Sequence, residues 1–250
     1  MSTPQPNEEQ AVTSSLIAHL IELRTRLVRT LLGLFLIFLV LFHWAGDIYH
    51  FLALPLMRAL PVGSHMIATD VTTPFFVPLK VTLMVAFVLS LPNTLYQLWA
   101  FVAPGLYQHE KRLVLPVLLS SFLLFLLGMA FAYFLVFPVI FHFMNAVTPQ
   151  GVSMMTDIDK YLSFILTLFM AFGVTFEVPV IVVLLVRFGI VSLEKLRIAR
   201  PYVVVGAFVV AAIVTPPDVL SQTLLAVPLW LLYELGLVIA RVLGRRADVA

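Results

Sequence analysis

The chain has no cysteine among its 250 residues. This absence excludes thiol catalysis, disulfide bonds and zinc sites built on cysteine. Charge is also scarce, because Asp, Glu, Lys and Arg together make up only 11% of the residues. No run of basic residues interleaved with aromatic residues occurs, so we expect no nucleic-acid partner.

Sequence motifs that carry chemistry are missing as well. The chain has no H-E-x-x-H, no G-x-S-x-G and no P-loop. The six histidines show no spacing typical of metal ligands. We therefore expect no catalytic residue, no metal and no cofactor, and we do not expect an enzyme.

Apolar sequence is abundant, with 62% hydrophobic residues. A soluble domain of this size needs far less apolar surface, so the composition predicts an all-α polytopic membrane protein. We predict one six-helix domain over residues 16–240, between a disordered cytoplasmic tail at 1–15 and a second cytoplasmic tail at 241–250. The predicted transmembrane spans are about 28–44, 79–100, 114–141, 161–186, 202–215 and 219–240.

The last two spans are expected to be short. Pro201 and Pro216 leave 14 residues between them, or about 21 Å of helix at 1.5 Å per residue. The hydrocarbon core of a bilayer is about 30 Å thick. Polar residues shorten the apolar run of span 6 as well. The pair would either thin the bilayer or form a shallow re-entrant hairpin.

Basic residues predict the orientation, because short cytoplasmic loops are enriched in Lys and Arg. The side of the membrane opposite the two termini carries only three basic residues, Arg58, Lys80 and Lys160. The side of the termini carries twelve, namely Arg24, Arg26, Arg29, Lys111, Arg112, Arg187, Lys195, Arg197, Arg200, Arg241, Arg245 and Arg246. This asymmetry predicts a multi-pass membrane protein with both termini in the cytoplasm.

Glu177 is the only charged residue in the 26-residue apolar run Tyr161–Val186. A carboxylate at that depth costs on the order of 2–4 kcal/mol. Gly173 precedes it by one turn and permits close helix approach, and a proline two residues later should kink the helix or free backbone carbonyls nearby. No basic residue lies at that depth, so we expect a carboxyl group that is neutral, hydrated or paired with Thr215 or Gln222.

Several interpretations of the acidic residues remain open. Glu177 is either a structural group bonded to a neighbouring helix or part of a functional site, for example the proton carrier of a proton-coupled secondary transporter. At the basic side, Glu22 and Glu110 stand on or beside short ordered elements. Each could simply form a local ion pair, Glu22 with Arg26 and Glu110 with its basic neighbours.

Six motifs in order resemble the TatC family of the twin-arginine protein translocase. They are HLIELRTRL (19–27), IATDVTTPFF (67–76), YQLWAFVAPGLYQHEKR (96–112), FMAFGVTFEVPV (169–180), RPYVVVGAFVV (200–210) and TPPDVLSQTLLA (215–226). The resemblance covers about residues 16–240. It is specific because six motifs recur together, whereas each alone would be weak.

The resemblance implies a receptor for signal peptides with consecutive arginines. Such a receptor works with the single-span subunits TatA and TatB, associates with itself in the membrane lipids, and exports folded proteins by means of the proton gradient. The implied signal-peptide site is Glu22, Arg24, Phe101 and Glu110. The implied contacts within the membrane are Glu177 on a concave face and Thr215 and Gln222 in a polar patch.

The resemblance also assigns residues on the far side. It places Pro55 in the first far-side loop and Asp218 in the turn beside the polar patch. Ala212 departs from some relatives, which carry a larger methionine there. This departure affects the expected detail of partner contact, but not the family resemblance.

Overall fold

The computed structural model describes residues 8–51, 67–102, 111–147, 157–215 and 218–247. These residues form helices, and their single β feature is an isolated bridge between Ile67 and Asp157. The major helices are α1 (Glu8–Phe42), α3 (Thr73–Val102), α5 (Lys111–Phe131), α6 (Phe137–Val147), α7 (Ile158–Phe176), α8 (Val178–Arg187), α10 (Arg200–Val214) and α11 (Val219–Ala247). Shorter elements are a helix over residues 45–51, the π-helical segment η1 (Ala132–Val136) and α9 (Leu193–Ile198).

Five helical segments of the described chain are long and apolar enough to cross a membrane, which confirms the predicted fold class. They are Ile17–Phe42, Thr73–Phe101, Val114–Met144, Ile158–Arg187 and Val219–Leu243. The sixth, α10, has 15 residues and is about 22 Å long at 1.5 Å per residue.

Two expectations about helix lengths differ from the structure. α11 has 29 residues, so only span 5 is short. The polar residues that we took to shorten span 6 are accommodated inside the helix, where Ser221 is buried and Glu234 pairs with Arg200. α1 already begins at Glu8, within the predicted tail, and continues without a break into the first span.

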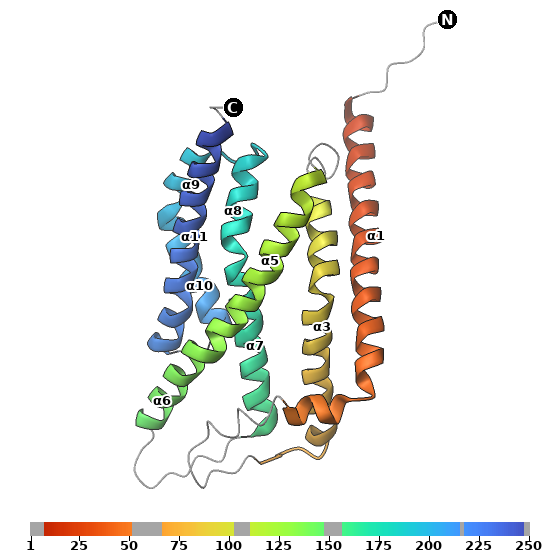
Figure 1. Ribbon diagram of the computed structural model, residues 1–250, viewed down its shortest axis with the longest axis vertical. Coiled ribbons are helices and arrows are strands. Elements are labelled where there is room, and N and C mark those ends of the chain that lie inside the picture. Colours follow the sequence, from red (N-terminus) through yellow and green to blue (C-terminus); the bar gives the residue numbers. More distant parts are fainter. Residues whose placement is uncertain (1–7, 52–66, 103–110, 148–156, 216–217, 248–250) are drawn as a thin grey trace, which may run out of the picture.

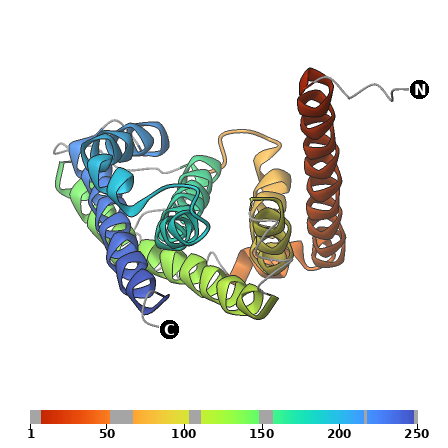
Figure 2. The same ribbon diagram turned by 90° about the horizontal axis from the view of Figure 1, so that it is seen from above.

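The helices form an open arrangement with α1 and α3 at one side and α10 and α11 at the other (Figure 2). α5, η1 and α6 together run obliquely from beside α3 toward the side of α11, across α7 (Figure 1). The start of α1 and the end of α11 lie at the same end, which we call the upper end (Figure 1). The starts of α3 and α7 lie at the opposite, lower end.

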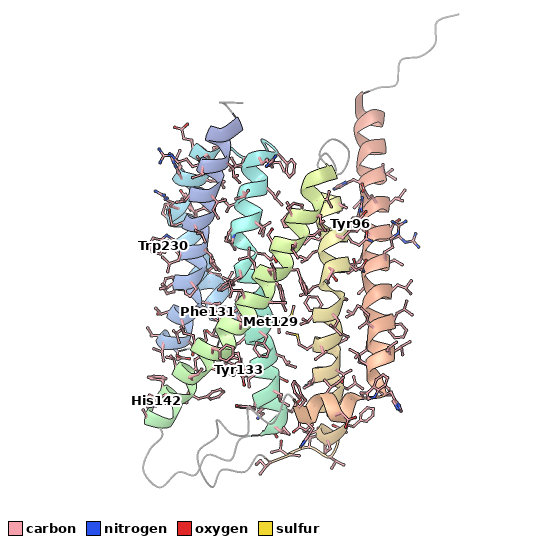
Figure 3. The ribbon with its side chains drawn as sticks, in the orientation of Figure 1. Tyr96, Met129, Phe131, Tyr133, His142 and Trp230 are labelled. Carbon is pink, nitrogen blue, oxygen red and sulfur yellow. The ribbon has the colours of Figure 1, made fainter. Side chains whose placement is uncertain are left out.

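The core is centred on α7. Its Ile165, Leu168 and Phe172 are at most 1% exposed and belong to the largest buried cluster. The oblique helix adds aromatic rings to this cluster, and Met129, Phe131 and Tyr133 follow one another along its middle (Figure 3). The ring of Phe131 lies 5.6 Å from that of Phe172. Side chains on the outer surface are also apolar, as expected for a lipid-facing bundle.

A small polar cluster, the lower-end clamp, joins the segment before α3 to the start of α7. Asp157 caps α7 by accepting the N–H groups of Asp159 at 2.9 Å and Lys160 at 3.0 Å. The same carboxylate accepts the N–H of Thr69 at 3.1 Å and the Thr69 hydroxyl. Lys80 on α3 pairs with Asp159 at 2.6 Å.

The hydrogen bonds of the clamp stabilise the ionised form of the Asp157 carboxyl group relative to the neutral form. The Thr69 hydroxyl and the backbone N–H groups lower the pKa of Asp157 from its usual 3.8 to about 2. Because the pKa is depressed in the folded protein, the carboxylate contributes stability above its ordinary pKa. That contribution is lost as the pH falls through the folded pKa.

We therefore predict that Asp157→Asn lowers the melting temperature at pH 7. Asparagine still caps the helix through its one oxygen, but its NH2 group cannot accept the Thr69 N–H, so the substitution removes the charge together with the acceptor for Thr69. The difference from wild type should shrink between about pH 4 and about pH 2, because the wild-type carboxylate becomes protonated there. Thermal unfolding in detergent across this range measures the effect. A difference that stays constant down to pH 2 would contradict the assigned role of the charge.

Candidate functional site

At the upper end, a ring contact between α1 and α3 involves Phe101, one of the predicted site residues, and lies one turn from Glu22, another of them. His19 on α1 stacks on Phe101 at the end of α3, with ring centroids 4.4 Å apart and an interplanar angle of 19°. Glu22 lies one turn after His19 on the same face of α1. The stacked rings therefore hold the face of α1 that bears Glu22 beside the end of α3.

Glu22 is already bonded to an arginine of its own helix. The Arg26 guanidinium donates to Glu22 Oε1 from Nε at 2.9 Å and from Nη2 at 2.6 Å. This is the local ion pair that the i,i+4 spacing allows. The Glu22 side chain is 38% exposed, so the pair is accessible to water and a competing guanidinium can replace Arg26.

The other two predicted residues of this site stand apart from the pair or cannot be placed. Arg24 is exposed, and it follows Glu22 by two residues, or about 200° around the helix. It therefore faces a different sector from Glu22. Glu110 lies outside the described residues, and so does Pro55.

Glu177 marks a break in the membrane helix, at the place where the sequence predicted a kink or freed backbone carbonyls. α7 ends at Phe176 and α8 begins at Val178, with Pro179 in the first turn of α8. The break lies about half-way along the bundle (Figure 1). Proline lacks the N–H that would continue the helical ladder, so its position explains the interruption.

The Glu177 side chain points into the protein and not toward an open face. The residue is 7% exposed, and neither carboxyl oxygen accepts a hydrogen bond from the described residues. The expected pairing with Thr215 or Gln222 is wrong, since the Thr215 hydroxyl donates to Ala211 O at 2.8 Å.

Two glycines let α5 and α7 approach closely beside this carboxyl group. A Cβ on Gly128 would lie 2.4 Å from the Phe172 carbonyl oxygen, and a Cβ on Gly173 would lie 2.4 Å from Phe125 Cζ. Both distances are far inside van der Waals contact. At Gly128 the neighbour is backbone, so only glycine fits, whereas a side chain at Gly173 would force the Phe125 ring to move. The close approach predicted at Gly173 is therefore confirmed, and α5 is the helix that makes it.

The turn between α10 and α11 holds a second group of predicted residues. Asp218 accepts the Ser221 N–H at 2.7 Å and its carbonyl accepts the Gln222 N–H at 3.2 Å, so it caps α11. Thr215 is 6% exposed and Gln222 is half-buried. Asp218 Oδ2 and the Ser221 hydroxyl are buried without a partner in the described residues, which leaves polar atoms free at this turn.

An apolar groove runs between α1, α3 and α7. One part, of about 470 Å³, is lined by α1 residues such as Leu31 and Phe35. A second part, of about 420 Å³, reaches Ser163 and Thr167 on α7 and Lys80 at the lower end. The two parts share Leu34 and Leu83. Glu177 does not line either part.

Sequence reasoning did not identify several polar residues of this region. Ser121 and Trp99 are buried and bonded to each other, with Trp99 Nε1 donating to Ser121 Oγ at 3.3 Å. Gln97 is 8% exposed, and its Oε1 accepts no bond among the described residues. A signal existed for Gln97, because a glutamine inside an apolar span is rare. A serine carries no comparable signal.

Comparison with known proteins identifies the family. A family model described as Sec-independent protein translocase protein (TatC) matches residues 18–228. The chain is 58% identical over 229 residues to the Sec-independent protein translocase protein TatC of Escherichia coli (strain K12), covering 92% of this chain and 89% of that protein. The chain belongs to the TatC family. The resemblance inferred from the six motifs is thereby confirmed.

Further TatC proteins agree in sequence and in structure. The TatC protein of Azotobacter chroococcum mcd 1 is 54% identical over 248 residues, which covers 99% of this chain and 96% of that protein. A crystal structure described as the twin arginine translocase receptor TatC superposes with a TM-score of 0.79 at 38% identity. That match covers 90% of this chain and 98% of the solved chain.

We predict that Gly128→Ala destabilises this TatC-family chain by about 1–3 kcal/mol, because the new methyl group meets the backbone of α7, which cannot move aside. Gly206→Ala on α10 is the matched control, since no atom lies within 4 Å of its Cβ position. Alanine should there raise stability by about 0.5–1 kcal/mol. Unfolding in detergent measures both. Equal behaviour of the two variants would contradict the close packing of α5 on α7.

Proposed function

We propose that this TatC-family chain is the signal-peptide receptor of a twin-arginine translocase. It binds the consecutive arginines of a signal peptide at its upper end, which faces the cytoplasm. It assembles with TatA and TatB, and with further copies of itself, in the lipids of a bacterial inner membrane. The complex exports folded proteins at the expense of the proton gradient, and the chain itself catalyses no reaction.

The observation that carries this proposal is the Glu22–Arg26 pair in a chain of the TatC family. Two N–H groups of one guanidinium reach a single carboxylate oxygen, so this carboxylate accepts an arginine fork. Arginine keeps its charge at any physiological pH and presents planar paired donors, which lysine lacks. A signal-peptide arginine can therefore take the place of Arg26 on Glu22.

Glu110 supplies the second carboxylate in this proposal, because two consecutive arginines require two acids. It follows α3 in the chain, and α3 ends beside Phe101, the residue that stacks on His19 of α1. Arg24, exposed on another sector of α1, contributes to the rim of the same site. The basic residues of the upper end leave any unmatched arginine in an unfavourable field.

The membrane part of the proposed site comprises Glu177, Thr215 and Gln222. Thr215 and the half-buried Gln222 flank the α10–α11 turn, where Asp218 caps α11, and in this proposal they form hydrogen bonds with an incoming partner helix. Glu177 contributes from the helix break, and its side chain must turn outward to touch a partner or the membrane-inserted part of the cargo signal. Pro55 belongs to the first loop of the lower end.

We predict that Glu110→Gln and Glu22→Gln both weaken signal-peptide binding, and that Glu110→Gln does so more. Breaking one partner of a desolvated charge pair costs about 2–5 kcal/mol, or roughly 30- to several-thousand-fold in affinity. The Glu22 carboxylate is 38% exposed, and an exposed pair is worth under about 1 kcal/mol. Its loss should therefore weaken binding less than about five-fold.

Titration of purified protein in detergent with a fluorescent signal peptide measures these affinities. Glu194→Gln is the matched control, since this acid is exposed on α9 at the same end. A peptide with Ala-Ala in place of Arg-Arg should bind weakly to every variant. Wild-type affinity of Glu110→Gln, or equal binding of the two peptides, would refute the proposed arginine site.

We predict that Glu177→Gln retains most transport, because glutamine keeps the shape and the polar contact. Glu177→Ala should impair recruitment of partner subunits more than binding of the signal peptide. Co-purification of the partners and export of a folded cargo measure the two effects. Wild-type transport by both variants would leave Glu177 a structural group. Complete loss in both would show that ionisation matters, and would favour a proton-carrier role.

A further inference from the structure

The hydrogen bond between Trp99 and Ser121 lies beside the buried cluster that joins α3, α5 and α8. Ser121 is fully buried and Trp99 is 4% exposed. The indole N–H of Trp99 donates to Ser121 Oγ at 3.3 Å. A serine hydroxyl has one proton to donate and two acceptor positions. Because Ser121 serves Trp99 as an acceptor, its own proton remains available to a second partner.

The packing of α5 on α7 determines which group that second partner is. The two helices run in opposite directions (Figure 1). Their closest contacts join Gly128 to Phe172 and Phe125 to Gly173. One further turn along each helix places Ser121 opposite Glu177. The backbones cannot separate or slide at the two glycines without losing these contacts, so the facing pair is held in register.

Glu177 needs the partner that this register supplies. Both carboxyl oxygens are buried and accept no hydrogen bond in the described residues. A buried acceptor without a partner costs about 1–3 kcal/mol. A hydroxyl donor relieves that cost whether the carboxyl group is neutral or charged, since either form has an acceptor oxygen.

We propose that Ser121 is the positioning residue of Glu177, with its hydroxyl oriented by Trp99 and its proton donated to the Glu177 carboxyl group. Trp99 lies two residues before Phe101 on α3, so the helix that ends at the proposed signal-peptide site also orients the donor to Glu177. The consequence for transport rests on the role of Glu177 proposed above. The hydrogen bond itself does not depend on that role and can be tested separately.

Infrared spectroscopy of the purified chain tests the bond directly. The Glu177 carboxyl vibration is isolated as the difference between wild type and Glu177→Gln. Ser121→Ala should shift this vibration, and Trp99→Phe should shift it less, because the hydroxyl remains but is no longer oriented. Ser120→Ala is the matched control, since the neighbouring hydroxyl donates to Val117 O at 2.9 Å on the exposed side. It should leave the vibration unchanged.

Transport assays then show whether Ser121 acts through Glu177. Ser121→Ala should reduce export and partner recruitment by a few-fold to about ten-fold, the effect of one hydrogen bond. In a Glu177→Ala background, Ser121→Ala should add no further loss. An additive loss would show a separate packing role and overturn the inference.

The two proposals fail in different ways. An unchanged Glu177 vibration in Ser121→Ala would refute the hydrogen bond, whatever transport does. A shifted vibration together with wild-type transport in Glu177→Ala would confirm the bond and refute the proposed role of Glu177. Folding of Ser121→Ala is verified by its melting temperature, and Ser121→Cys, with its weak donor, provides a second variant that should shift the vibration in the same direction.

Discussion

The contact between α5 and α7 at Gly128 and Gly173 is the constraint on which the centre of this molecule depends. The missing side chains let one helix rest on the backbone of the other, so neither can move along its neighbour by even a fraction of a turn. Within a lipid bilayer such packing is a main source of helix association, because burying apolar surface gives little gain there. The oblique course of α5 past α7 follows from it.

The same contact determines the surroundings of the one buried carboxyl group. α7 stops at Phe176, and α8 begins at Val178 with Pro179 in its first turn. A break of this kind frees backbone groups that a continuous helix would satisfy internally. Neighbouring helices cover it, and α11 packs so closely there that a Cβ on Gly236 would lie 3.0 Å from Pro179 Cα. The polar residue, the broken helix and the close helix contact thus form a single local structure in which each element requires the other two.

Sequence reasoning reached some of these features and missed others for identifiable reasons. Glu177, Gly173 and Pro179 were recognised because each is unusual within one apolar run. The close approach was found as expected, and the predicted kink is a full break between two helices. Ser121 lies 56 residues before Glu177, and no local pattern gives the register between their helices. Glu22 was identified from spacing, and its bond to Arg26 was one of the two alternatives. The length of α11 was misjudged because polar residues were counted as ends, whereas Ser221 and Glu234 find partners or burial within the helix.

The lower-end clamp has a consequence for the order in which the chain is made. Thr69 and its acceptor Asp157 are 88 residues apart. A ribosome adds about 5–20 residues per second, so Thr69 precedes its partner by roughly 4–18 s. α3 is completed during that interval, while the Thr69 donors have no acceptor from Asp157 and Lys80 has no counter-ion from α7. The lower end of this half of the bundle is therefore fastened only after the start of α7 has been synthesised, and α7 gains its cap in the same event.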